Sequence, residues 1–120
     1  MAVSVSFRTY LLEQMGQLRP VTSRPMFGGL AIFAEGRTFA LVADDVLYFK
    51  VDDSNQPDFL AANMGPFLPF GDPERPMHYF ELPAEVLEDP DQLAVWMTKA
   101  IAVAKRAKAK PKAKPKAKRN

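Results

Sequence analysis

Apolar residues recur with helical spacing in the first segment of the chain. Four of them are separated by four, four and three positions, which places them on one face of a helix. Ser4 or Ser6 is suited to cap this helix, because a serine oxygen accepts a backbone N–H at a helix start. Gly16 or the Arg19-Pro20 pair is expected to end it. The apolar positions are Phe7, Leu11, Met15 and Leu18.

Four runs with the composition of β-strands follow, and short connections join the last three. The connections are Glu35-Gly36 and Asp44-Asp45, which are typical of hairpin turns because Gly and Asp tolerate positive φ. Residues 29–51 are therefore predicted to form an antiparallel meander. The four runs are VTSRPMF (21–27), GLAIFAE (29–35), RTFALVA (37–43) and VLYFKV (46–51).

Two-residue loops would place Ala34 opposite Arg37 and Ala43 opposite Val46, and this register divides the sheet into two faces. The first face is nearly all apolar and is expected to meet the helices. The second face is too apolar for open water, so another element or another chain is expected to cover it. The first face carries Ala31, Phe33, Thr38, Ala40, Val42, Leu47, Phe49 and Val51. The second carries Leu30, Ile32, Phe39, Leu41, Tyr48 and Lys50, with Arg37 at its rim.

The second half of the chain is predicted to add a short helix, two strands and a long helix. DDSNQPDFLAANMG (52–65) offers Asp53, Ser54 or Asn55 as the helix cap, and Gly65 suits a left-handed exit. PFLPF (66–70) is expected to be an edge or irregular strand because of its prolines, and MHYFEL (77–82) is a second strand candidate.

The last helix has the clearest start of all. Asp89 is placed as its cap, Pro90 occupies the first helical position, and Gln92 is placed to reach back to the cap. An apolar face with helical spacing follows, formed by Leu93, Trp96, Met97, Ala100 and Ala104. The predicted fold class is therefore α+β, a mainly antiparallel sheet with the order helix, strands, helix, strands, helix.

The stretch RPMFGG raises the question of a phosphate loop. A nucleotide loop needs glycines at set spacings between a strand and a helix, whereas Gly28 and Gly29 precede another strand. The preferred interpretation is structural: the two glycines permit a bend or bulge between strands, and Met26 and Phe27 fill the core.

The same stretch, together with later residues, resembles the N-terminal domain of TfoX/Sxy proteins over roughly residues 7–104. The resemblance includes an Arg-x-Met-Phe-Gly-Gly start, a Leu-Tyr-x-Lys strand, a Tyr-x-x-Leu-Pro stretch and a Leu-x-x-Trp helix. The matching residues are Arg24, Met26, Phe27, Gly28, Gly29, Gly36, Phe39, Ala40, Leu47, Tyr48, Lys50, Asp53, Asn55, Tyr79, Leu82, Pro83, Leu93 and Trp96.

The resemblance implies a small α+β domain with the element order derived above. The best-known full-length relatives regulate natural competence alongside the cyclic-AMP receptor protein, and they add a helical C-terminal domain. This chain continues instead into a lysine-rich segment. The resemblance therefore predicts a regulatory or interaction domain, linked to transcription or competence.

The candidate chemistry argues against an enzyme. The chain has no cysteine and a single histidine, His78, which is expected to be a surface or packing residue. Asp44-Asp45 and Asp52-Asp53 are interpreted as a turn and a helix start, because they lack the ligand spacing of a calcium loop. We therefore predict no catalytic residue, metal site or cofactor. Without a secretion signal or a long apolar run, a cytoplasmic location and no membrane contact are expected.

Charge divides the chain into two parts. Residues 1–104 hold all 14 acidic residues and seven basic ones, a net charge of 7 − 14 = −7. Residues 105–120 hold nine basic residues and no acidic one, a net charge of +9. The chain is therefore predicted to consist of an α+β domain (1–104) and a disordered basic tail (105–120).

The basic tail suggests nonspecific contact with nucleic acid, because its cations can neutralise phosphates without reading bases. Association with the acidic domain, or a merely solubilising role, is the alternative. The predicted nucleic-acid contacts are Lys105, Arg106, Lys108, Lys110, Lys112, Lys114, Lys116, Lys118 and Arg119. A second prediction is a protein-binding or homodimer face on the sheet, formed by Ile32, Phe39, Leu41, Tyr48 and Lys50.

Overall fold

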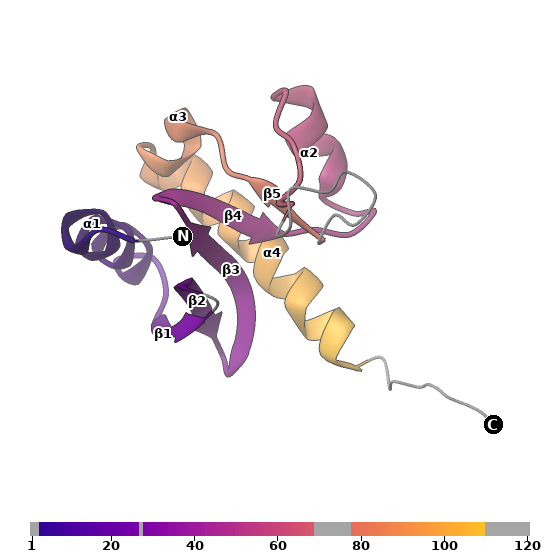
Figure 1. The fold of residues 1–120 in the computed structure, drawn as a ribbon. Helices are drawn as coiled ribbons and strands as arrows, with labels where there is room; N and C mark the ends of the chain where they lie inside the picture. The colour runs from indigo at the N-terminus through magenta and orange to yellow at the C-terminus, as the bar shows by residue number, and fades with distance from the viewer. Residues whose placement is uncertain (1–2, 27, 69–77, 110–120) are drawn as a thin grey trace.

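The computed structural model describes residues 3–26, 28–68 and 78–109, and it confirms the α+β fold class. Figure 1 shows one antiparallel sheet with helices packed against it, and its strand order is β1-β2-β3-β4-β5. The elements are α1 (Val5–Gly16), β1 (Thr22–Met26), β2 (Gly29–Ala34), β3 (Arg37–Ala43), β4 (Val46–Lys50), α2 (Gln56–Ala61), β5 (Tyr79–Glu81), α3 (Ala84–Leu87) and α4 (Pro90–Ala109).

Both predicted hairpin turns of the meander are confirmed. Glu35 and Gly36 have φ values of 55° and 79°, and Asp44 and Asp45 have values of 52° and 59°. Two successive positive φ values match the right-handed twist of the strands that the turn joins. The predicted pairs Ala34 with Arg37 and Ala43 with Val46 are also present.

The glycines of RPMFGG lie where β1 turns into β2. Gly28 has a φ of 75°, and Gly29 pairs with Met26 at the start of β2. A Cβ atom on Gly29 would overlap the backbone carbonyl of Val42 in β3, so the two backbones approach too closely for any side chain. This geometry confirms the backbone role of the glycines. Met26 packs against a small apolar cluster, and Phe27 lies outside the described residues.

The predicted assignment of residues to the two sheet faces was partly wrong. The register between β2 and β3 shifts between Ile32 and Phe33, so that Phe33 pairs with Thr38 but Ile32 pairs with Ala40. Phe39 is the extra residue of this bulge, and beyond a bulge the pairing differs by one position from that of regular strands. Residues of β2 that were expected on one face consequently lie on the other.

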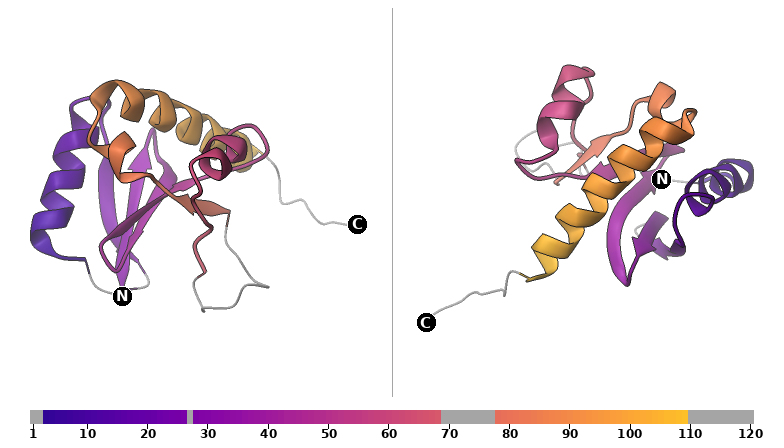
Figure 2. Two further views of the ribbon diagram at one scale, coloured as in Figure 1. Left: turned by 90° about the horizontal axis from the view of Figure 1, so that it is seen from above. Right: turned by 180° about the vertical axis from the view of Figure 1, so that it is seen from behind.

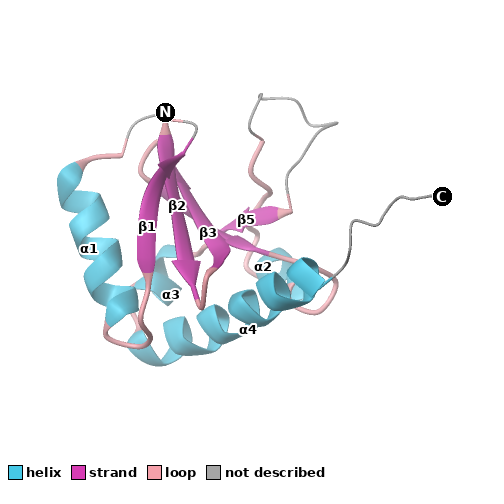
Figure 3. Ribbon diagram, turned by 90° about the horizontal axis from the view of Figure 1, so that it is seen from below, coloured by secondary structure: helices cyan, strands magenta, loops and turns pink. Residues whose placement is uncertain are grey.

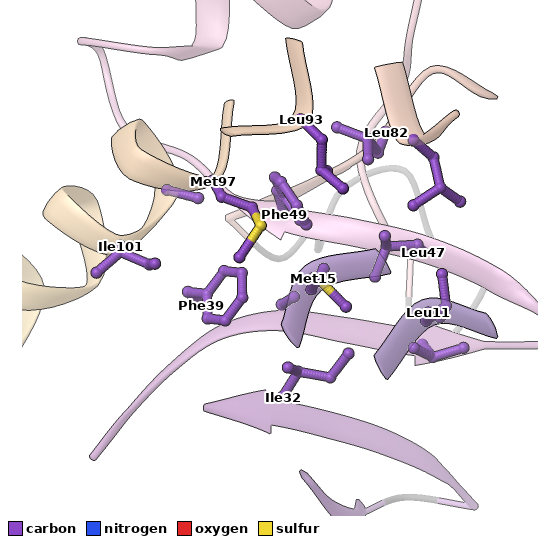
Figure 4. Packing of buried hydrophobic residues seen from close by; sticks show 14 of the residues in the cluster. Leu11, Met15, Ile32, Phe39, Leu47, Phe49, Leu82, Leu93, Met97 and Ile101 are labelled. Atoms are coloured by element: carbon purple, nitrogen blue, oxygen red, sulfur yellow. The ribbon is translucent and has the colours of Figure 1, made fainter. Parts of the chain in front are cut away.

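The main core lies between one face of the sheet and the helices. In Figure 2, α1 and α4 lie on the same side of the strands, and Figure 4 shows their apolar side chains meeting those of the sheet. Leu11 and Met15 of α1 and Leu93 of α4 are fully buried in this cluster. The predicted apolar faces of the first and last helices are therefore confirmed. Figure 4 labels Leu11, Met15, Ile32, Phe39, Leu47, Phe49, Leu82, Leu93, Met97 and Ile101.

The starts of α1 and α4 follow the predicted capping. The Ser4 hydroxyl accepts a hydrogen bond from the Phe7 N–H over 3.2 Å. The Asp89 carboxylate accepts from the Asp91 N–H over 3.0 Å and from the Gln92 side chain over 2.9 Å, and these bonds hold the pKa of Asp89 below its usual value. The predicted cap of α4 is therefore confirmed.

The segment between β4 and β5 differs from the prediction in detail. The left-handed residue after α2 is Asn63, with a φ of 63°, and not Gly65. Phe67 belongs to no named strand, although its N–H donates to the Tyr79 carbonyl over 2.7 Å beside a bridge between Pro66 and Phe80. The helix α3 was not predicted, because four residues are too few to show a helical period.

Helix length and hydropathy bear on membrane insertion. Across the described ranges, no helix combines the length and the apolar character that crossing a bilayer demands.

Candidate functional site

The second face of the sheet carries its own small apolar cluster. Ala31, Leu41 and Ala43 are buried there beneath Phe67 and Tyr79. The ring of Phe67 lies 4.9 Å from that of Tyr48, centroid to centroid. The apolar part of this face is therefore covered by residues of the same chain, which is one of the two expectations for it.

The predicted interaction face is divided by the bulge. Ile32 and Phe39 are fully buried in the main core, on the helix side, so these two residues were wrongly assigned to the second face. Leu41, Tyr48 and Lys50 lie on the second face as predicted, with Leu41 buried and the other two half-buried. Burial raises the pKa of Tyr48, and the carboxylates of Glu81 and Asp44 raise it further.

Two cations on this side of the sheet lie over aromatic rings. The Cζ of Arg24 in β1 is 5.2 Å from the ring centroid of Phe33 in β2. The Nζ of Lys50 in β4 is 4.9 Å from that of Tyr79 in β5. A ring face attracts a cation and so restrains where each charge lies. Burial lowers the pKa of Lys50 and raises that of Tyr79 to about 12.

A groove of about 430 Å³ lies between these two pairs. Arg37 also lines it, and the Nε of Arg37 is the one buried side-chain nitrogen or oxygen in the described ranges without a hydrogen-bond partner. Arg24 and Tyr79 were noted in the sequence only as part of the resemblance, and Lys50 was also part of the predicted interaction face. Phe33 was assigned to the wrong face. The bulge gives no sequence signal, so their meeting was not predictable. The groove is lined by Arg24, Phe33, Gly36, Arg37, Thr38, Lys50, Tyr79 and Ala104.

The last turns of α4 are tied to the acidic body by ion pairs. The Lys105 Nζ lies 2.7 Å from Oε1 of Glu35, in the turn between β2 and β3. The Lys105 hydrogen bond is the main reason why the pKa of Glu35 is lowered. The Arg106 Nη2 lies 2.9 Å from Oδ2 of Asp52, in the loop after β4, and 2.7 Å from the Ser54 hydroxyl.

These contacts correct the predicted boundary of the basic tail. Residues 105–109 were expected to be disordered, but they continue α4, which ends at Ala109 just before Pro111. Two of the predicted nucleic-acid contacts, Lys105 and Arg106, pair with carboxylates of the body. The backbone of Lys108 lies in α4. The remaining predicted contacts lie outside the described residues; they are Lys110, Lys112, Lys114, Lys116, Lys118 and Arg119.

His, Cys, Asp and Glu side chains are the usual ligands of a metal site and common catalytic groups. Among residues 3–26, 28–68 and 78–109, no three His, Cys, Asp or Glu side chains come together as a metal site would require. His78 is exposed, and its carbonyl accepts the N–H of Val51 over 2.9 Å. The Asp45 carboxylate accepts the N–H of Ser4 over 2.7 Å, in keeping with a structural role for this turn.

Comparison with known proteins places these observations in a family. The curated proteins contain no match to the chain. The sequence profile of the TfoX N-terminal domain matches residues 13–104, which extend from the middle of α1 into α4 and so include the whole sheet and the groove. The chain therefore belongs to the TfoX N-terminal domain family.

Proposed function

We propose that this protein is a non-enzymatic regulatory domain that works in the cytoplasm and contacts nucleic acid, without reading its sequence, through the basic C-terminal segment. The family membership supports a regulatory role of the competence type. The observation that carries the nucleic-acid contact is the separation of charge, −7 for residues 1–104 against +9 for residues 105–120.

The position of the C-terminal end of α4 supports this proposal. The basic segment follows directly from α4, whose C-terminal end extends past the strands in Figures 1 and 2. Residues 110–120 contain six cations, five of them lysines, and no acidic residue. Lysines and arginines that neutralise phosphates release counterions, which favours binding at low salt regardless of base sequence.

A second candidate is association of the segment with the acidic body of the same chain. The ion pairs of Lys105 with Glu35 and Arg106 with Asp52 favour it, because they already bring the first cations of the basic region onto that body. Tethering gives the remaining cations a high effective concentration near the other carboxylates. Nucleic acid would then compete with the body for the same cations.

A salt series tests the proposal by comparing the native chain with a variant in which residues 110–120 carry no charged side chain. The six cations of residues 110–120 are replaced by glutamine, and fluorescence anisotropy measures the affinity of both full-length proteins for a DNA duplex. If all six contact phosphates, the slope of log K against log salt for the native chain is more negative than that of the variant by about 5. Equal slopes and affinities would contradict the proposal. A variant that also unfolds at lower temperature would support association with the body.

A further inference from the structure

The groove on the second side of the sheet receives side chains from every strand. Arg24 comes from β1, Phe33 from β2, Arg37 from β3, Lys50 from β4 and Tyr79 from β5. Ala104 of α4 completes the wall. Figure 3 shows β1, β2 and β3 side by side, with β5 farther along the sheet. A volume of about 430 Å³ falls in the range of small-ligand sites, which is roughly 300–1,000 Å³.

The charge of this groove is opposite to that of the folded body. Among the residues that the structure describes, three cations line it and no acidic residue does. Among the described residues, none of Arg24, Arg37 and Lys50 lies within ion-pair distance of a carboxylate. Glu35 lies next to the groove and interacts with the charge of Arg37, but its two carboxylate oxygens are engaged by Lys105 and Arg19. A concave cationic surface of this kind concentrates anions even on an acidic protein.

The Arg37 side chain has a buried donor that lacks a hydrogen-bond acceptor. Its Nε is buried without a partner, and a buried donor without a partner costs about 1–3 kcal/mol. Guanidinium N–H groups are arranged to match the oxygens of a carboxylate or phosphate. A shift of the Arg37 side chain towards an oxyanion in the groove would give its guanidinium an acceptor, and the anion would offset the desolvation of the half-buried Lys50.

We propose that this groove binds the phosphate group of a phosphorylated ligand, with Arg24, Arg37 and Lys50 as its cationic contacts. Three cations favour phosphate over a single carboxylate, because phosphate carries more charge and more acceptor oxygens. The ligand is either a free nucleotide-sized molecule or the backbone of a single nucleic-acid strand. The proposed contacts include no cation of the basic C-terminal segment, and the proposal does not depend on the role of that segment.

Calorimetric titration of the full-length protein at low salt tests the site with pyrophosphate, adenosine monophosphate and a short oligothymidylate. Lys50→Met removes the groove charge and keeps the apolar stem. Lys99→Met is its matched control. Lys99 lies on the exposed surface of α4, outside the groove, and its Nζ is 2.8 Å from Oδ2 of Asp58 in α2. We expect Lys50→Met to weaken binding about tenfold, which corresponds to a loss of about 1.4 kcal/mol in binding free energy. Lys99→Met should leave binding within twofold. The basic segment is present in both variants, so its contribution cancels.

The pattern across the three probes identifies the source of the phosphate. Lys50-dependent binding of pyrophosphate or adenosine monophosphate indicates a small ligand, and Lys50-dependent binding of the oligonucleotide alone indicates a nucleic-acid strand. If Lys50→Met unfolds, the exposed residue Arg24 provides a second variant, Arg24→Gln, with the same expected loss. Absence of binding by all three probes, or equal losses in the groove variants and Lys99→Met, would overturn the proposal.

Discussion

The two glycines of the β1–β2 connection have different structural tasks. Gly28 adopts a backbone conformation that side chains disfavour, and Gly29 allows β2 to approach the carbonyl of Val42. The first requirement is conformational and the second is steric. A helix-terminal phosphate loop would need neither a strand after the glycines nor this contact with β3.

Gly29→Ala is therefore expected to destabilise the fold by about 1–3 kcal/mol, because the new methyl group overlaps the Val42 carbonyl and forces the strands apart. Urea unfolding measures the loss. Gly65→Ala is the control, since a Cβ there has no neighbour within 4 Å and its φ is not positive; it should change stability by less than about 0.5 kcal/mol. Equal stability of the two variants would contradict the steric role of Gly29.

Asn55 is a buried polar residue that closes the loop between β4 and α2. Its Oδ1 accepts the Asp52 N–H over 2.9 Å, and its Nδ2 donates to the Lys50 carbonyl over 3.0 Å. It was predicted as one of three possible caps of α2, but its side chain makes no capping bond to that helix. Its hydrogen bonds instead fix the backbone that carries Lys50 into the groove.

Asn55→Ala should cost about 1–3 kcal/mol, because it leaves a buried donor and a buried acceptor unpaired. Thermal and urea unfolding measure this loss. Gln56→Ala, at the neighbouring half-buried position, is the comparison and should have an effect below about 0.5 kcal/mol. A similar, small effect of both substitutions would mean that the loop does not depend on Asn55.

At the scale of elements, the docking of the end of α4 depends on acids near the sheet. Asp52 holds Arg106 and Ser54, and its pKa is lowered from 3.8 to about 2. The hydrogen bond from Ser54 is the largest cause, and Arg106 adds to it. A lowered pKa in the folded state stabilises that state above the ordinary pKa, and this contribution is lost as the pH falls. The stabilisation from Asp52 is therefore lost as the pH decreases from about 4 to about 2.

Ser54→Ala is expected to raise the midpoint of the Asp52 titration towards 3.8, and Arg106→Met should raise it by a smaller amount. Carbon-13 NMR of the Asp52 carboxyl group follows the titration directly. Lys99→Met serves as the control because it removes a cation of α4 that pairs with Asp58 instead. An unchanged midpoint in Ser54→Ala would show that the hydrogen bonds at Asp52 do not lower its pKa.

Elements with local signals were predictable from the sequence. The serine cap of α1, the Asp-Pro start of α4 and both positive-φ turns each depend on neighbours in the chain. The assignment of residues to the two faces of the sheet was not predictable, because the bulge at Phe39 results from packing between strands. The ion pairs at the end of α4 were not predictable either, since Lys105 and Arg106 are held by residues more than 50 positions away. The groove depends on the bulge, which places Phe33 on its side of the sheet, and it was therefore only partly foreseen, through Lys50 of the predicted interaction face.

At the scale of the whole molecule, an acidic folded body carries two cationic regions. One is the groove, where three positive side chains are fixed by the sheet. The other is the C-terminal segment, in which six cations follow the last described residue. The groove is shaped for a single phosphorylated ligand, whereas the segment has the charge to follow a nucleic-acid backbone. The two regions can therefore be separated by experiment.

NMR titration of the isotope-labelled full-length protein with a DNA duplex tests the proposed function most directly. We predict that the signals of residues 110–119 change first and most, that salt reverses the change, and that duplexes of unrelated sequence give the same result. Signals that change only in the folded body, with residues 110–119 unaffected, would contradict a function based on the basic segment.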